Sequence, residues 1–279
     1  MSKLLIVIAQ LLASVLPVIA QDTTAASTSS THSVWHGFDR YHFRVMDRPA
    51  YLVVPKRIAD GKPWVWRARF PDFHFEMDVE LLKKGFHVAY VDVAGLFGSP
   101  LAMQIGDAFY DDVTIQRGLA ARPALEGVSR GGLFVYNWAA RHPERVACIY
   151  CDTPVLDFRS WPGGKGTGIG SAVAWQQCLA AYGFTEADGL EFQGNPINHA
   201  AVIAQHRIPL LHIVSENDVV VPPHENTYVL QQRLQALGHT LPVISVAKGT
   251  EQSHGHHFVH PEQKRVVDFI RKHASVNEK

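Results

Sequence analysis

The chain has 279 residues, of which 47% are hydrophobic, and its 26 basic side chains balance 26 acidic ones. A neutral chain lacks the basic surface typical of nucleic-acid-binding proteins, and this length is compatible with one large α/β domain. The three cysteines, Cys148, Cys151 and Cys178, are too few and odd in number to indicate a disulfide framework.

The N-terminal segment differs from the rest of the chain. Lys3 precedes an apolar run that is interrupted at Gln10 and ends near Ala20. This pattern predicts a cleaved secretory signal over residues 1–20, and therefore a secreted or periplasmic protein without stable membrane insertion after cleavage. An uncleaved membrane anchor is the alternative, although the run is shorter than the roughly 20 apolar residues of a span.

Residues 21–37 begin with a run rich in Ser, Thr and Ala, which predicts a flexible spacer before a folded domain over residues 38–279. Strand-forming runs over residues 41–45 and 50–54 then predict a hairpin, and residues 64–70 predict a further strand.

The chain then alternates between helical and strand patterns. Helices are predicted over residues 76–84, 132–140, 225–237 and 263–273. Apolar strands are predicted over residues 87–93, 123–128, 146–150, 210–214 and 242–246. This alternation predicts an α/β fold with a mostly parallel central sheet flanked by helices. Residues 155–207 do not follow this alternation of strands and helices, and we expect them to form a lid or insertion over the sheet.

Residues 127–131 read Gly-Val-Ser-Arg-Gly and lie between a predicted strand and a predicted helix. This sequence fits the G-x-S-x-G turn that presents a nucleophilic serine at the end of a strand. Glycines suit the turn because its backbone is strained and its neighbours approach closely. The pattern predicts Ser129 as a nucleophile.

A serine nucleophile needs a base to take its proton and a carboxylate to orient that base. In this fold the carboxylate precedes the histidine along the chain. The loop after the predicted strand 210–214 contains Asp218, which we predict to be the acid. Glu216 and Asp152 are the alternatives.

The last loop before the final helix contains several histidines. We predict His256 as the base because it follows a glycine, with His257 and then His254 as alternatives. Together with His260 these side chains also suggest a metal site, but no H-E-x-x-H helix supports one. We expect neither a metal nor another cofactor.

Two backbone N–H groups should stabilise the oxyanion, one from Arg130 and one from the region where residues 64–69 lead into the next loop, at Arg67 or Ala68. The side chains of Arg67 and Arg69 either bind an acidic group of the substrate or pair with buried carboxylates. Trp161 is predicted to contact the substrate.

Four tryptophans could provide ring-stacking surfaces for a carbohydrate or could belong to the core: Trp64, Trp66, Trp161 and Trp175.

The chain resembles the α/β-hydrolase superfamily over residues 38–273, through residues 66–70, 126–132, 136–140 and 160–164. Within the superfamily it is similar to a group of exported bacterial esterase-like proteins. The resemblance implies the core sheet, the triad and a cofactor-free hydrolytic mechanism. Arg130, directly after the nucleophile, is also similar to an arginine of glucuronoyl esterases that helps to stabilise the oxyanion.

These features together predict a secreted or periplasmic serine hydrolase that cleaves a carboxylic ester of a small molecule or carbohydrate through an acyl-enzyme. One alternative is a serine peptidase of the prolyl oligopeptidase type. Another is a non-catalytic binding protein on the same scaffold. The sequence does not indicate an oligomeric state.

Overall fold

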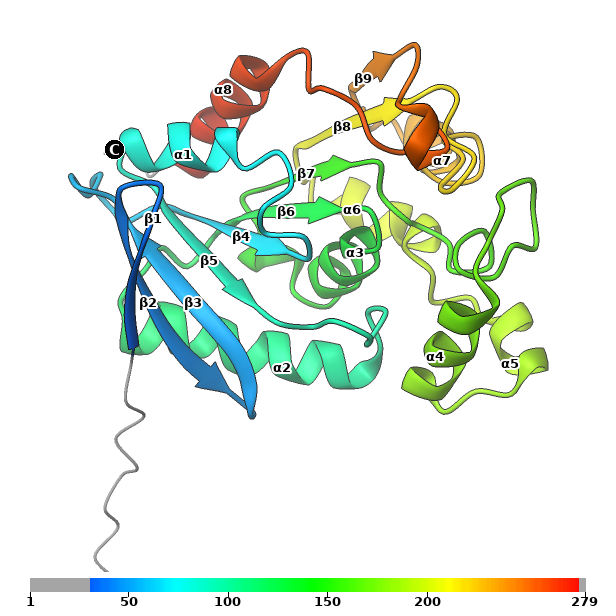
Figure 1. Ribbon diagram of the computed structural model, residues 1–279, viewed down its shortest axis with the longest axis horizontal. Coiled ribbons are helices and arrows are strands. Elements are labelled where there is room, and N and C mark those ends of the chain that lie inside the picture. Colours follow the sequence, from blue (N-terminus) through cyan, green and yellow to red (C-terminus); the bar gives the residue numbers. More distant parts are fainter. Residues whose placement is uncertain (1–30, 276–279) are drawn as a thin grey trace, which may run out of the picture.

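The computed structural model describes residues 31–275, so the predicted signal at residues 1–20 and most of the predicted spacer lie outside the described residues. Figure 1 shows a twisted central sheet with helices on both faces. The sheet contains nine strands in the order β1-β2-β3-β5-β4-β6-β7-β8-β9.

The strands are β1 (Thr31–Trp35), β2 (Phe38–Val45), β3 (Arg48–Val54), β4 (Trp64–Ala68), β5 (His87–Val91), β6 (Ala124–Val128), β7 (Cys148–Asp152), β8 (Leu210–Ser215) and β9 (Val243–Val246). The α-helices are α1 (Glu76–Lys83), α2 (Pro100–Asp111), α3 (Gly131–Arg141), α4 (Ala172–Tyr182), α5 (Glu186–Glu191), α6 (Ala200–Gln205), α7 (Thr227–Ala236) and α8 (Gln263–Ala274). The short helices are η1 (Asp112–Gln116), η2 (Pro143–Arg145), η3 (Pro196–His199) and η4 (Glu251–Ser253).

The first three strands are antiparallel and the other six are parallel to one another. The predicted hairpin is β2–β3, and its turn residues Met46 and Asp47 both have positive φ, 45° and 60°. A two-residue turn of this kind matches the right-handed twist of the paired strands. The mostly parallel sheet of an α/β fold is confirmed.

Strand β1 corrects the predicted spacer. Residues 31–35 pair with β2 in register from Thr31 opposite His42 to Trp35 opposite Phe38. Only Trp35 of this strand is buried, so the strand contributes little to the core. Its backbone hydrogen bonds to β2 keep it at the edge of the sheet.

Helices cover the sheet in two layers. Helices α1 and α8 lie on one face, and α2, α3, α6 and α7 lie on the other (Figure 1). Cys148 and Cys151 of β7 are buried in different layers, as expected for residues three apart in a strand. Both cysteines and Cys178 are unpaired by disulfides.

The predicted insertion at residues 155–207 divides into two parts. Helices α4 and α5 lie beyond the carboxyl ends of the parallel strands (Figure 1). Helix α6 instead packs on α3 and α7, and its Ala200 and Ile203 belong to the main core. It supplies the crossover that a parallel connection from β7 to β8 requires, so only the earlier part of this segment can act as a lid.

No helix in the described part of the chain has the length and apolar character needed to cross a membrane.

Candidate active site

Ser129 lies at the sharp turn between β6 and α3. Its φ is 50°, in the left-handed region that non-glycine residues rarely adopt. The backbone of the turn is fixed on both sides, because the Ser129 N–H donates to the Asp152 carbonyl and its own carbonyl accepts from Val155, each at 2.9 Å. The strained serine is therefore held by neighbouring strand ends, as a nucleophile elbow requires.

The glycines of the elbow allow its close packing. A Cβ on Gly127 would lie 2.9 Å from Val135 Cγ2, and a Cβ on Gly132 would lie 2.7 Å from the Val155 carbonyl oxygen. A Cβ on Gly131 would overlap the Ala68 carbonyl oxygen. Each position thus excludes a side chain for a steric reason.

Ser129, His256 and Asp218 form one hydrogen-bonded chain. The Ser129 Oγ lies 3.0 Å from His256 Nε2, and His256 Nδ1 lies 2.6 Å from Asp218 Oδ2. The second carboxylate oxygen of Asp218 accepts from the backbone N–H groups of Val220 and Val221, both at 2.8 Å. These two donors fix the direction of the carboxylate, so Asp218 can orient the imidazole.

The histidine loop is held against the acid loop through backbone contacts. Gly255 has a φ of +84°, and a Cβ there would overlap the Asn217 carbonyl oxygen. The Asn217 side chain accepts from the Gly249 N–H at 2.8 Å, and the Val219 N–H donates to the His254 carbonyl at 3.1 Å. The glycine before His256 is therefore required for the close approach of the two loops.

The alternative triad members lie elsewhere. Glu216 is exposed and accepts from the Tyr228 hydroxyl at 2.5 Å. His254 and His257 are exposed, and neither is bonded to Ser129. Among the three carboxylates and three histidines considered, the structure joins only Asp218 and His256 to the serine.

Asp152 belongs to a second Asp–His pair beside the triad. Its Oδ2 lies 2.5 Å from His74 Nδ1, and His74 Nε2 lies 2.8 Å from the Phe258 carbonyl oxygen. Burial acts to lower the His74 pKa, but the bonds to Asp152 and Phe258 outweigh it and raise the pKa above the ordinary value. His74 therefore has both ring nitrogens occupied and is bonded to Asp152, not to Ser129.

Of the two roles predicted for the Arg67 side chain, the structure shows the ion pair with buried carboxylates and not substrate binding. Its side chain is fully buried and pairs with Asp78 Oδ2 at 2.5 Å and Glu126 Oε1 at 2.8 Å. It therefore stabilises the interior and cannot contact a substrate. Burial raises the pKa of Glu126 well above its ordinary value, Asp78 adds to the rise, and Arg67 opposes it. The guanidinium of Arg67 thus lies between two buried carboxyl groups, and burial favours the protonated form of Glu126.

The strand pairing of β4 also corrects the residue predicted to provide the second oxyanion donor. Arg67 is paired with both neighbouring strands, and Ala68 is paired with Gly127 of β6. The first N–H groups beyond this paired region belong to Arg69 and Phe70, whose φ values are 66° and 46°. These two residues are better candidates than Arg67 or Ala68. The Arg130 N–H, at the start of α3, has no acceptor among residues 31–275.

Only one of the four tryptophans lies next to the elbow. Trp64 and Trp66 are core residues, and Trp175 is buried in the cluster under α4. The half-buried Trp161 faces the Arg130 guanidinium, with 5.1 Å between the ring centre and the guanidinium carbon. Sequence reasoning did not find Phe70 and Phe97, whose rings also surround this guanidinium.

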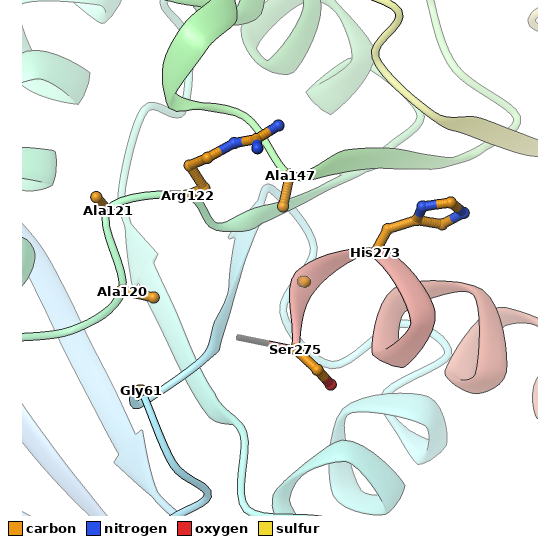
Figure 2. A pocket seen from close by; sticks show the side chains of 8 residues that line it. Gly61, Ala120, Ala121, Arg122, Ala147, His273 and Ser275 are labelled. Atoms are coloured by element: carbon orange, nitrogen blue, oxygen red, sulfur yellow. The ribbon is translucent and has the colours of Figure 1, made fainter. Parts of the chain in front are cut away.

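A separate pocket of about 410 Å³ lies at the amino ends of β4, β6 and β7 (Figure 2). Gly61, Ala147 and His273 are among its lining residues. This is the edge of the sheet opposite to Ser129, so the pocket is unrelated to the triad. Within residues 31–275, no group of three His, Cys, Asp or Glu side chains is arranged to hold a metal ion.

Comparison with known proteins identifies the family of this chain. Residues 112–276, more than half of the chain, match the prolyl oligopeptidase family. No curated protein shows significant sequence similarity to the chain.

Three solved structures illustrate the shared fold. An acylaminoacyl peptidase in complex with Z-Gly-Gly-Phe-chloromethyl ketone superposes with a TM-score of 0.63 and 18% identity, over 87% of this chain and 43% of the peptidase. An esterase of Pyrococcus furiosus gives 0.57 and 16%, over 89% of this chain and 94% of the esterase. Carboxyl esterase 2 of Tuber melanosporum gives 0.58 and 17%, over 90% of each chain. The chain spans less than half the length of the peptidase, and at these identities the likeness establishes the α/β-hydrolase fold.

Proposed function

The chain belongs to the prolyl oligopeptidase family and is a serine hydrolase, and we propose that it cleaves a carboxylic ester with Ser129 as the nucleophile. The observation that carries the proposal is the continuous hydrogen-bonded chain from Ser129 through His256 to the buried Asp218. Serine, base and orienting carboxylate at these separations are the groups that acyl transfer to a hydroxyl requires.

The reaction proceeds in two halves. His256 Nε2 takes the proton of the Ser129 hydroxyl as Oγ attacks the ester carbonyl, and Asp218 stabilises the resulting imidazolium. The tetrahedral intermediate then expels the alcohol, to which His256 returns the proton. Water, deprotonated by His256, then attacks the carbonyl carbon of the acyl-enzyme and forms a second tetrahedral intermediate. This intermediate releases the carboxylic acid as His256 returns the proton to Ser129 Oγ.

The negative oxygen of each tetrahedral intermediate needs donors that are already in place. We assign one to the backbone N–H of Arg130, which has no acceptor of its own among the described residues. We assign the other to the N–H of Arg69 or Phe70, at the end of β4. Because Gly131 has no side chain, the Ala68 carbonyl can lie close to the elbow, so the end of β4 is beside the site where a donor is needed.

Two esterases support the choice of an ester bond. Both share the fold over 90% or more of their own length, so a fold of this extent is sufficient for ester hydrolysis. Peptide hydrolysis is the second candidate, because the family match and one of the similar structures point to peptidases.

A matched pair of chromogenic substrates separates the two candidates. The p-nitrophenyl ester and the p-nitroanilide of one N-acylated amino acid differ only in the bond that is cleaved. We expect Ser129-dependent release of nitrophenol and no release of nitroaniline above the rate without enzyme. Because peptidases also cleave such activated esters, Ser129-dependent cleavage of the anilide is the result that would assign a peptidase, and the Ser129→Ala variant should lose every activity of the wild type. Ser245→Ala, which alters an exposed serine on β9, is the control and should retain them.

We also propose that the enzyme acts after export, on the basis of the secretory pattern over residues 1–20. Expression of the whole chain in a bacterium, followed by fractionation and N-terminal sequencing, tests this. Recovery of a chain that still carries residues 1–20 in the cytoplasm would contradict it.

A further inference from the structure

The side chain of Arg130 lies inside a cluster of three aromatic rings. Its guanidinium carbon lies 5.1 Å from the ring centre of Trp161, 5.5 Å from that of Phe70 and 6.0 Å from that of Phe97. These rings come from the segments after β7, β4 and β5, so three loops at the carboxyl edge of the sheet converge on the residue next to the nucleophile. We call Phe70, Phe97 and Trp161 the aromatic cage.

Within residues 31–275, no carboxylate pairs with the Arg130 guanidinium. This differs from the fully buried Arg67, which has two carboxylates. A partly desolvated cation is normally paired. Burial lowers the pKa of Arg130, and the positive charge of Arg69 lowers it further. Arg130 therefore lies beside a second cation and not beside a counter-ion.

Arg69 is the second cation. Its guanidinium carbon lies 4.7 Å from the centre of the Phe70 ring, so Arg69 and Arg130 contact the same ring. The Nε of Arg69 is buried without a hydrogen-bond partner. The nearest carboxylate, Asp92, is 3.9 Å away and also pairs with Arg48 at 3.4 Å. Arg69 thus keeps one donor, its Nε–H, that no described group accepts.

Two guanidinium groups that share one ring repel each other, and an anion between them removes this repulsion. Guanidinium donors form a planar fork that matches a carboxylate. Phe70 lies against both side chains, and Phe97 and Trp161 lie against Arg130 as well. The pair therefore has the charge and the free donors of a carboxylate-binding site beside Ser129.

We propose that Arg130 and Arg69 bind a carboxylate carried by the substrate, so that the enzyme prefers esters bearing a free acid group near the scissile carbonyl. This inference rests on the proposed ester hydrolysis and deepens it by naming a substrate class. The carboxylate can belong to the acyl part or to the alcohol part, and paired substrates distinguish these sources.

The test uses substrates that differ only by methylation of the carboxylate. For the acyl part, mono-p-nitrophenyl succinate is compared with its methyl ester. The readout is nitrophenol release above the rate without enzyme, because the free carboxylate of the succinate also expels nitrophenol by intramolecular attack. For the alcohol part, 4-acetoxybenzoate is compared with its methyl ester. In one of these pairs the acid should exceed the methyl ester in kcat/KM by about ten- to a hundredfold, the range expected for charged hydrogen bonds. Raised salt should reduce this ratio.

Variants assign the preference to the two arginines. Arg130→Gln and Arg69→Gln should each lower the ratio of acid to methyl ester at least about tenfold. Arg117→Gln is the matched control, because Arg117 also lies over an aromatic ring, Phe43 at 3.8 Å, but pairs with Asp112 away from the elbow. The ratio of kcat/KM for acid to that for methyl ester should be the same in Arg117→Gln as in the wild type. Thermal unfolding of each variant establishes that it is folded.

Two results would overturn the proposal. One is a wild-type ratio of one or less in both substrate pairs. The other is an equal loss of kcat/KM for acid and methyl ester in Arg130→Gln, which would assign the side chain to the oxyanion instead.

A measurement without turnover separates this proposal from the ester assignment. Succinate should slow the reaction of Ser129 with a fluorophosphonate in the wild type and have at least about tenfold less effect in Arg130→Gln. If no ester is cleaved but this protection is observed, the ester assignment fails and the anion site stands. If esters are cleaved and succinate gives no protection, the anion site fails alone.

Discussion

His256 Nδ1 lies 2.6 Å from Asp218 Oδ2, while the neighbouring Asp152 is bonded to His74. Two buried aspartates at the carboxyl edge of the sheet thus each hold one histidine, but only His256 reaches Ser129. This arrangement assigns different roles to two residues of the same chemistry.

Replacement of each aspartate by asparagine tests that assignment. Asp218→Asn removes the acceptor that fixes the tautomer of His256, so we expect kcat to fall by about 10³- to 10⁴-fold. Asp152→Asn leaves the triad intact and should lower kcat by less than about tenfold. The measurement is steady-state hydrolysis of a p-nitrophenyl ester. A reversed order would place the working acid at Asp152.

Gly255 gives a prediction about the loop that carries His256. Gly255→Ala would place a Cβ against the Asn217 carbonyl oxygen at a φ of +84°. Relief of this overlap must move the loop, so we expect kcat/KM to fall by at least about 10²-fold. Gly238→Ala is the control, because Gly238 has a φ of +70° but no atom within 4 Å of the added Cβ. It should lose about 1 kcal/mol of stability and keep its activity. Equal activity of both variants would contradict the steric account.

Glu126 gives a prediction about stability and pH. Its native pKa is raised by burial, so the native state retains a proton that the unfolded chain releases near its ordinary pKa of 4.5. Stability from this group is therefore present below about pH 4.5 and decreases as pH rises toward the native pKa, by up to about 1.4 kcal/mol per pH unit.

Glu126→Gln removes this proton release. Urea unfolding at about pH 5 and pH 8 should show a smaller loss of stability in the variant than in the wild type. Glu144→Gln, at an exposed glutamate, should behave as the wild type does. A variant at Glu126 with the wild-type pH dependence would contradict the raised pKa of this carboxyl group.

Arg67→Met gives a separate prediction about stability. It leaves the Asp78 carboxylate buried and unpaired and should cost about 3–5 kcal/mol, measured by urea unfolding.

The sequence was sufficient for the central sheet and for the positions of Ser129, Asp218 and His256. Each of these residues lies in or just after a short loop whose pattern is local, and the order of the loops is fixed by the fold. Local pattern also predicted the β2–β3 hairpin, because its turn needs only two residues.

Other features depend on contacts between distant residues, which a local pattern does not show. Arg67 pairs with Glu126, 59 residues away. The sequence alone therefore could not show whether the Arg67 side chain forms a buried ion pair or binds the substrate. Strand β1 contains few apolar residues and is held by its pairing with β2, so it resembled a spacer. The aromatic cage joins Phe70, Phe97 and Trp161 from three separate loops, which only the folded chain brings together.

The role of Ser129 as the nucleophile is tested most directly by covalent labelling. Purified protein is treated with a fluorophosphonate, and the modified residue is identified by peptide mass mapping. We expect one adduct, on Ser129, no labelling of Ser129→Ala, and labelling of His256→Ala slowed by at least about 10³-fold because the base is absent. Labelling of Ser129→Ala at the wild-type rate, or an adduct on a different serine, would contradict the assignment.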